Sequence, residues 1–279
     1  MERKTGNNQQ ERKPVLQVNV DLQCSKGIYN FFCKNISEII PKIIATLSKA
    51  SKEALSSMEY AFLVMCLWVV QHTTNKLEGI SSISSSVCDN MFCKARQTLK
   101  DCICKHCYAY NQQSYQDGIK EHNILNGIIL RNVLIPAKHF KLLKILFPYI
   151  RIESFGDVFN VTQARNYIRI IKAFPEKRCA IWSKNIEIWR KAFEEEGKPK
   201  NTTYVHSSSY LNKPETPNKE KYPFVDHVFT VYEKKYAREN NITINCGGKK
   251  CLQCILQRKN CYYRISKNNN TYFINELKK

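Results

Sequence analysis

Two groups of cysteines carry the strongest chemical signal in this chain of 279 residues, which has 13 cysteines in all. The first group has the spacing C-x-C-x2-C at Cys102, Cys104 and Cys107, and it is preceded by Cys88 and Cys93. Two thiolates separated by two residues can face one metal from a tight turn, and soft thiolates prefer zinc, copper(I) or iron–sulfur clusters. We therefore predict a cysteine-ligated metal centre in this segment.

The residues leave the metal in the first group open. A zinc ion needs a fourth ligand, from Cys93, Cys102 or His106, whereas a [4Fe–4S] cluster held by three cysteines leaves one iron free for a substrate or cofactor. The alternative is a set of buried free thiols, which pack as small hydrophobic groups. That alternative suits isolated cysteines such as Cys66 and Cys179 better than it suits five cysteines within twenty residues.

The second group lies near the C-terminus and has the spacing C-x4-C-x2-C-x6-C, at Cys246, Cys251, Cys254 and Cys261. Gly247 follows the first of these cysteines, and glycine permits the positive φ that turns backbone amides toward sulfur. Four thiolates in so short a segment predict a self-contained structural metal site. Zinc and iron–sulfur are both chemically adequate there.

The chain is strongly basic, with a formal net charge of +20. Residues 219–279 hold 13 Lys and Arg against 5 Asp and Glu, and Lys249, Lys250, Arg258 and Lys259 surround the second cysteine group. Such a surplus favours binding of nucleic acid through the basic C-terminal region. The alternative is an ordinary solvated basic surface.

The cysteines are expected in a reducing compartment. The N-terminus has no apolar stretch behind its basic residues, which argues against a signal peptide. The longest apolar run, Ala61–Val70, is shorter than the roughly 20 residues that span a bilayer. We therefore predict a cytoplasmic protein without a membrane partner, in which clustered cysteines are more often metal ligands than disulfides. The oligomeric state is left open.

The elements that must position these cysteines follow an alternating pattern. Helical spacing of apolar residues covers 37–71, with a second helix beginning near Ser56 and a capping pattern that includes Glu59. The expected strands are Leu77–Ser84, Tyr149–Ser154, Arg178–Ser183, Thr203–Ser207, Val225–Tyr232 and Ile242–Asn245, and further helices are expected at Gln112–Leu130, Thr162–Ala173 and Ile186–Glu195. Strands that alternate with helices predict a parallel sheet with crossover helices.

We predict an α/β fold, a partial (β/α) barrel with parallel strands. Residues 1–74 form a helical N-terminal extension in this interpretation. Residues 75–245 form the barrel-like domain with the cysteine loop, and residues 246–279 form a small Cys-rich metal module with a basic tail. In such folds the chemistry gathers at the ends of the strands.

Polar residues end several of the expected strands. They are Gly156 and Asp157, then Ser183 and Lys184, then His206. Parallel strands bring their carboxyl ends to one face, so we predict that these five residues bind a cofactor beside the first cysteine group. No phosphate-binding glycine loop, nucleophile elbow or H-E-x-x-H motif occurs in the chain, and the sequence identifies no catalytic residue.

Four motifs occur in an order that resembles a known family. They are C-x2-C-Y-A at 104–109, R-I-x3-G-D-x-F at 151–159, the strand end at Ser183–Lys184, and C-G-G-x2-C-x2-C at 246–254. The chain thereby resembles, over roughly residues 75–265, the "gene product 88" domain of phages and mobile elements. That family is in turn similar to radical S-adenosylmethionine proteins, which build a cysteine loop after the first strand of a partial barrel.

The resemblance implies an iron–sulfur protein of phage or mobile-element origin. Cys104 and Cys107, with Cys93 or Cys102 as a third ligand, would hold a [4Fe–4S] cluster, and Gly156–Asp157 would hold the amino group of S-adenosylmethionine. The chain departs from the family pattern at the cysteine spacing, which is not C-x3-C-x2-C, and at a Gly-Gly-Glu element that is reduced to Gly156–Asp157. The alternative function is a zinc-binding, basic nucleic-acid-binding protein without catalysis.

Overall fold

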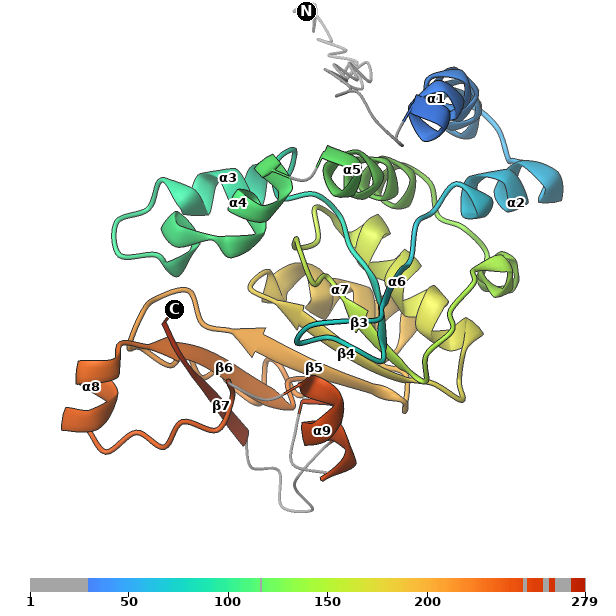
Figure 1. Cartoon of the computed structure of the whole chain (residues 1–279). Coiled ribbons are helices and arrows are strands. Elements are labelled where there is room, and N and C mark those ends of the chain that lie inside the picture. The colour runs from blue at the N-terminus through green and yellow to red at the C-terminus, as the bar shows by residue number, and fades with distance from the viewer. Residues whose placement is uncertain (1–29, 116, 248–249, 258–260, 264–271, 279) are drawn as a thin grey trace, which may run out of the picture.

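A seven-stranded sheet forms the centre of the protein. The computed structural model describes residues 30–115, 117–247, 250–257, 261–263 and 272–278 (Figure 1). The strands are β1 (Val70–His72), β2 (Ile80–Ile83), β3 (Tyr149–Ile152), β4 (Arg178–Ser183), β5 (Thr202–Ser207), β6 (His227–Tyr232) and β7 (Tyr272–Leu277). Their order in the sheet is their order in the chain; β1 is antiparallel to β2, and β2 to β7 run parallel. The predicted α/β class with a mostly parallel sheet is confirmed.

Helices connect the parallel strands, as is usual in a parallel sheet, except that β5 and β6 are joined by residues 208–226 without a helix. The α-helices are α1 (Asn30–Ala50), α2 (Ser57–Met65), α3 (Met91–Gln97), α4 (Tyr108–Tyr115), α5 (Asp117–Asn132), α6 (Val161–Ala173), α7 (Ile186–Glu196), α8 (Lys234–Glu239) and α9 (Cys251–Leu256), and the 3-10 helices are η1 (Ile103–His106) and η2 (Ala137–Leu142). None of the described helices is long and apolar enough to cross a membrane.

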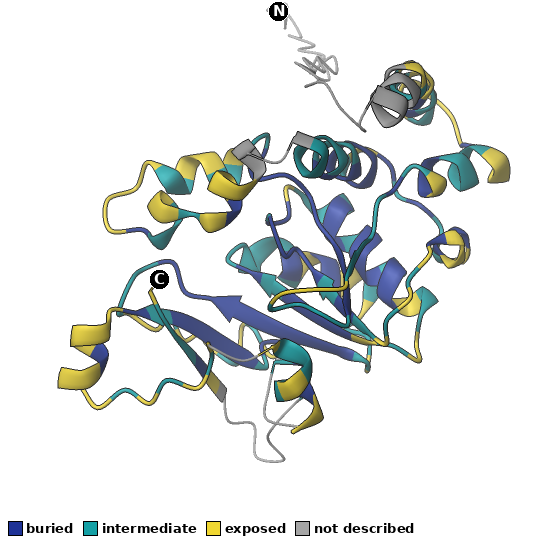
Figure 2. Cartoon of the chain, in the orientation of Figure 1, coloured by how far each residue is buried: buried dark blue, intermediate teal, exposed yellow. Residues whose placement is uncertain are grey.

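One face of the sheet packs against α1, α2, α5, α6 and α7. Alternate residues of the strands, among them Ile150, Ile152 and Ile181, are fully buried in this core, since successive side chains of a strand point to opposite faces. Figure 2 shows the burial of the central strands and the inward faces of α6 and α7. Most of the hydrophobic stabilisation lies on this side of the sheet.

The opposite face packs against the C-terminal segment. Ile80 and Ala180 on the sheet contact Ile255 of α9 and Tyr262. A neighbouring apolar cluster joins β5, β6 and β7 and includes Cys246 and Cys261 at its edge. The second cysteine group therefore lies against the sheet.

The predicted start of the second helix is confirmed. The Ser56 hydroxyl accepts a hydrogen bond from the Glu59 amide at 3.3 Å, and the Ser56 amide donates to the Glu59 carboxylate at 2.7 Å. These two bonds form a capping box, which satisfies amides that the first turn leaves unpaired.

The strand predicted at Ile242–Asn245 is wrong. This segment has no strand conformation; it lies beside β7, where the Asn245 and Cys246 amides donate to the Asn275 carbonyl. The sheet instead ends with β7, in the basic tail that sequence reasoning treated as a metal module. A short alternation of apolar and polar residues does not distinguish a strand from an extended segment that lies next to a strand.

Candidate functional site

The first cysteine group lies in the connection between β2 and β3. Cys93 belongs to α3, Cys104 to η1, and Cys107 immediately precedes α4. Asn90 anchors this segment: its side-chain oxygen caps α3 by accepting from the Phe92 amide, and its side-chain amide donates to the Asp157 carbonyl at 2.5 Å. The cysteine loop is thereby attached to the residues that follow β3.

Cys93, Cys104 and Cys107 lie within electrostatic reach of one another. Burial raises the pKa of the Cys93 thiol far above its usual range, and the nearby acids and the charges on Cys104 and Cys107 raise it further. Cys102 is buried, and its thiol shares a hydrogen bond with Cys104. Cys88, Cys93 and Cys107 pack on one apolar cluster. The prediction that these thiols hold a metal stays a prediction.

Two buried acids lie beside these thiols, at the end of β3. Glu153 is 3% exposed, and its carboxylate accepts hydrogen bonds from the Tyr167 hydroxyl at 2.7 Å, the Ser85 amide at 3.0 Å and the Gln163 side chain at 3.1 Å. Burial raises the pKa of Glu153 to about 7, and the hydrogen bonds oppose that rise. Burial also raises the pKa of Asp157. Both acids raise the pKa of Cys93, which places them within electrostatic reach of its sulfur.

Asp157 joins the ends of β3 and β4. Its carboxylate accepts hydrogen bonds from the Ser183 hydroxyl, from the Lys184 amide at 2.8 Å and from the Val158 amide at 2.8 Å. The three hydrogen bonds hold the Asp157 carboxylate in one position, so this side chain links the end of β3 to the end of β4. The prediction that Asp157 binds an ammonium group stays a prediction, but this side chain already has three partners.

Gly156 occupies the tightest point of this edge. A Cβ atom built on it would lie 2.5 Å from the Ser85 carbonyl oxygen and 2.7 Å from the Glu153 carboxylate. Any side chain at this position would therefore force the two segments apart. This close approach explains the glycine of the Gly156–Asp157 motif in structural terms.

Lys184 supplies a cation near the thiols. Its ammonium group donates to the Ser207 hydroxyl at 2.9 Å, and its charge lowers the pKa of Cys104, which burial raises to about 12. The Lys184 backbone amide donates to the Asp157 carboxylate, and this hydrogen bond fixes the position of the Lys184 backbone. Of the predicted cofactor-binding residues, Lys184 is the one whose positive charge acts on Cys104 of the cysteine loop.

His206, at the end of β5, is buried and neutral. Burial lowers its pKa to about 4, and the Glu215 carboxylate lies 4.0 Å from its Nε2. Its Nδ1 has no hydrogen-bond partner among the described residues. The pairing of β4 with β5 places His206 opposite Ser183, so the predicted strand-end residues do share one edge of the sheet.

The second cysteine group contacts β2, β7 and the loop between β1 and β2. The Cys251 amide donates to the Lys76 carbonyl at 2.8 Å, and the Lys76 ammonium lies 3.9 Å from the Cys246 sulfur and 2.6 Å from the Glu276 carboxylate. Burial raises the pKa of Cys261 to about 12, whereas the charge of Arg151 lowers it and the charges of Cys251 and Cys246 raise it. These thiols are also neighbours in space.

Arg151 begins the R-I-x3-G-D-x-F motif, but sequence reasoning gave it no role at a site. Its guanidinium group lies over the Trp182 ring, 3.7 Å from the ring centroid, and its charge lowers the pKa of Cys246, Cys251 and Cys261. Arg151 is half-buried, and among the described residues it forms no ion pair with a carboxylate and its Nε has no hydrogen-bond partner, so nearby thiolates would offset its charge. A cation in an otherwise apolar strand was the available signal.

The donor chemistry of both groups suits a soft metal, but the thiols do not converge on one point. Among the residues that the structure describes, no three His, Cys, Asp or Glu side chains surround a position where one metal ion could bind. A zinc ion draws four ligands to about 2.3 Å from one centre. An iron–sulfur cluster binds each cysteine through a different iron and so keeps the sulfurs farther apart.

Three of the four cations expected around the second cysteine group, namely Lys249, Arg258 and Lys259, lie outside the described residues. Lys250 is described, and its ammonium group forms an ion pair with Glu78 at 2.5 Å.

Comparison of the chain with protein-family models, with curated proteins and with solved structures finds no match. The resemblance drawn from the four motifs therefore stays a prediction.

Proposed function

We propose that this chain is an iron–sulfur protein of the radical S-adenosylmethionine type, in which Cys93, Cys104 and Cys107 hold a [4Fe–4S] cluster. The observation that supports this most is the electrostatic proximity of Cys104 to Cys93, Cys107 and Lys184, beside the residues that follow β3 and β4. Folds with alternating strands and helices carry their chemistry at the carboxyl edge of the sheet. Chain order equal to strand order also fits a partial (β/α) barrel.

The chain's own residues would prepare this edge for a charged ligand. Cys93, Cys104 and Cys107 would hold the cluster, which would supply one iron with an open position for a ligand such as S-adenosylmethionine. Asp157 holds the Lys184 backbone, and the Lys184 ammonium group, which donates one hydrogen bond to Ser207, keeps further donors for a carboxylate. Glu153 carries a proton below about pH 7, which limits the negative charge next to the thiolates. The apolar cluster of Val87, Ala109 and Phe155 shields the thiols from water.

The second cysteine group is proposed as a structural metal site, with Cys246, Cys251, Cys254 and Cys261 as ligands. Its thiols pack between the sheet and α9, away from the strand ends that carry Asp157. Zinc or an iron–sulfur cluster would suit it.

Anaerobic titration of the purified protein with S-adenosylmethionine tests this function. We expect wild-type protein to bind, and Lys184→Met to bind at least about tenfold more weakly, because a charge-assisted hydrogen bond contributes roughly 1.5–3 kcal/mol. Lys191→Met is the matched control, since Lys191 is an exposed lysine of α7. Absence of binding to cluster-loaded wild-type protein would contradict the S-adenosylmethionine assignment.

A further inference from the structure

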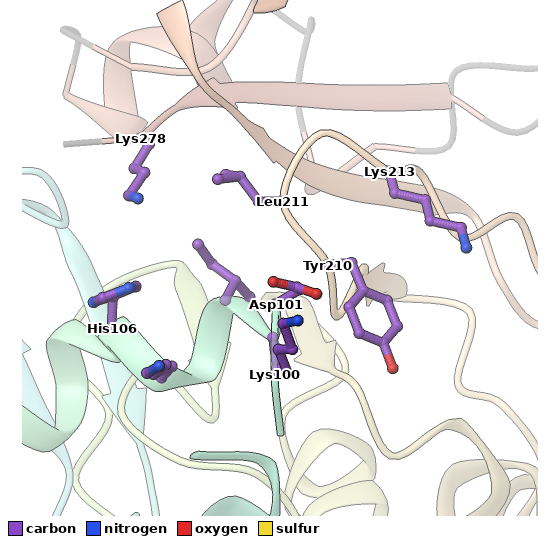
Figure 3. Close-up of a pocket in the computed structure, with 10 residues that line it drawn as sticks. Lys100, Asp101, His106, Tyr210, Leu211, Lys213 and Lys278 are labelled. Carbon is purple, nitrogen blue, oxygen red and sulfur yellow. The ribbon is translucent and has the colours of Figure 1, made fainter. Parts of the chain in front are cut away.

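A basic pocket lies next to the first cysteine group (Figure 3). It has a volume of about 670 Å³ and is built from the segment around η1, the connection between β5 and β6, and the residue after β7. Segments far apart in the chain thus meet around one cavity. Pockets of this size take nucleotide-sized ligands.

Backbone bonds hold the three walls in place. Cys102 and Tyr210 form a β-bridge, and the Ile103 amide donates to the Ser209 carbonyl at 2.8 Å. On the far wall, the Lys278 amide donates to the Tyr232 carbonyl at 2.7 Å. The pocket is therefore formed before any ligand arrives, which lowers the entropic cost of binding.

The lining is positively charged and largely unpaired. Lys100, Lys105, Lys213 and Lys278 line the pocket, against one acid, Asp101. Within the described part of the chain, none of these four lysines forms an ion pair with a carboxylate. Four exposed ammonium groups around one cavity attract an anion with several charges.

Tyr210 adds an aromatic surface at the rim. It is half-buried, and the Lys213 ammonium lies 5.8 Å from its ring centroid. In Figure 3 the Tyr210 ring and Lys213 lie on one side of the cavity, opposite Lys278 and His106. A tyrosine beside lysines is the combination that binds single-stranded nucleic acid, because a base can stack while the phosphates contact the cations.

We propose that this pocket binds the phosphodiester backbone of a short single-stranded nucleic acid, with one base stacked on Tyr210. A flexible single strand can adapt its backbone to the cavity and stack one unpaired base on Tyr210. Binding itself requires no metal. The further step, that the strand is the substrate presented to the cysteine loop, rests on the proposed function, and its basis is that Cys102 lines the pocket and contacts Cys104.

The test is fluorescence anisotropy with a labelled eight-nucleotide single strand over a range of salt concentrations. Each phosphate contact contributes about 0.7 to the slope of log affinity against log salt. The variant Lys105→Ala/Lys213→Ala/Lys278→Ala should lower that slope by about 2. The variant Lys141→Ala/Lys144→Ala/Lys191→Ala removes the same charge from other exposed positions and should leave the slope unchanged.

Three outcomes would overturn the proposal. The first is an equal decrease of the salt slope in both triple variants. The second is that wild-type protein does not bind the strand at about 50 mM salt. The third is that a mononucleotide binds as tightly as the strand. The variant Cys104→Ser separates the two proposals. Unchanged binding by metal-free Cys104→Ser protein supports the pocket even where no cluster is found, whereas a cluster without strand binding refutes the pocket alone.

Discussion

Glu153 shows how one residue links stability to pH in this protein. Its pKa is about 7 in the folded state and about 4.5 in a solvated chain, so the folded state binds the proton more tightly. Its contribution to stability is complete below about pH 4.5 and is lost as pH rises through 7. The Glu153→Gln variant cannot titrate at this position. We expect the stability advantage of wild type over Glu153→Gln to shrink by about 1.4 kcal/mol between pH 6 and pH 8.

Urea unfolding of both proteins at the two pH values measures this difference. A constant or widening advantage would show that the folded carboxyl group keeps an ordinary pKa.

A second prediction concerns the close packing at Gly156. Because a Cβ atom would collide with the Ser85 carbonyl and the Glu153 carboxylate, Gly156→Ala should destabilise the protein by roughly 1–3 kcal/mol. Gly127→Ala is the control. Its Cβ would lie 3.3 Å from the Ser85 side chain, a milder contact than at Gly156, and alanine favours the helical conformation of α5 more than glycine does. Thermal unfolding compares the two. Equal melting temperatures for Gly156→Ala and wild type would contradict the close approach.

At the scale of elements, α9 and its cysteines attach the C-terminal segment to the sheet. Removing one ligand from a structural metal site uncouples metal binding from local folding. We expect Cys254→Ser to be cleaved in this segment roughly tenfold faster or more by a protease. Cys66→Ser, which changes an isolated half-buried thiol next to α2, is the control. Wild-type protease resistance and metal content in Cys254→Ser would refute a structural site.

Elements were predictable from the sequence where their apolar pattern was long. Helices α6 and α7 and strands β3 to β6 follow clear periods, and the prediction places each of them within a few residues of its observed bounds. The short α3, η1 and α8 lack such a pattern. Strand β7 follows an Asn-rich stretch and contains Asn275 and Glu276, so its pairing with β6 comes from tertiary contacts that the local sequence does not encode.

The candidate site was predictable in part. Cysteine spacing and polar strand ends identified Cys104, Cys107, Asp157 and Lys184, which the structure gathers at one edge. Glu153 was missed because its burial depends on Ser85, Gln163 and Tyr167, which come from different elements. The basic pocket was missed for the same reason, since its lysines come from three distant segments.

At the scale of the whole molecule, the two cysteine groups occupy different surroundings of one sheet. The first lies beyond the strand ends with buried acids and Lys184, and the second lies under α9 on the sheet face. We propose that the first group, at the strand ends, is the reactive site and that the second group, on the covered face of the sheet, is structural. Under this proposal, the net charge of +20 on the chain favours an anionic substrate.

The most direct test of this account is the metal content of anaerobically purified protein. Wild-type protein should be brown and contain iron and acid-labile sulfide. The variants Cys104→Ser and Cys107→Ser should lose the iron and the sulfide that the first cysteine group binds. Cys66→Ser should keep all of the iron and sulfide. Wild-type protein that is colourless and contains zinc, or no metal, at the first cysteine group would contradict the iron–sulfur assignment.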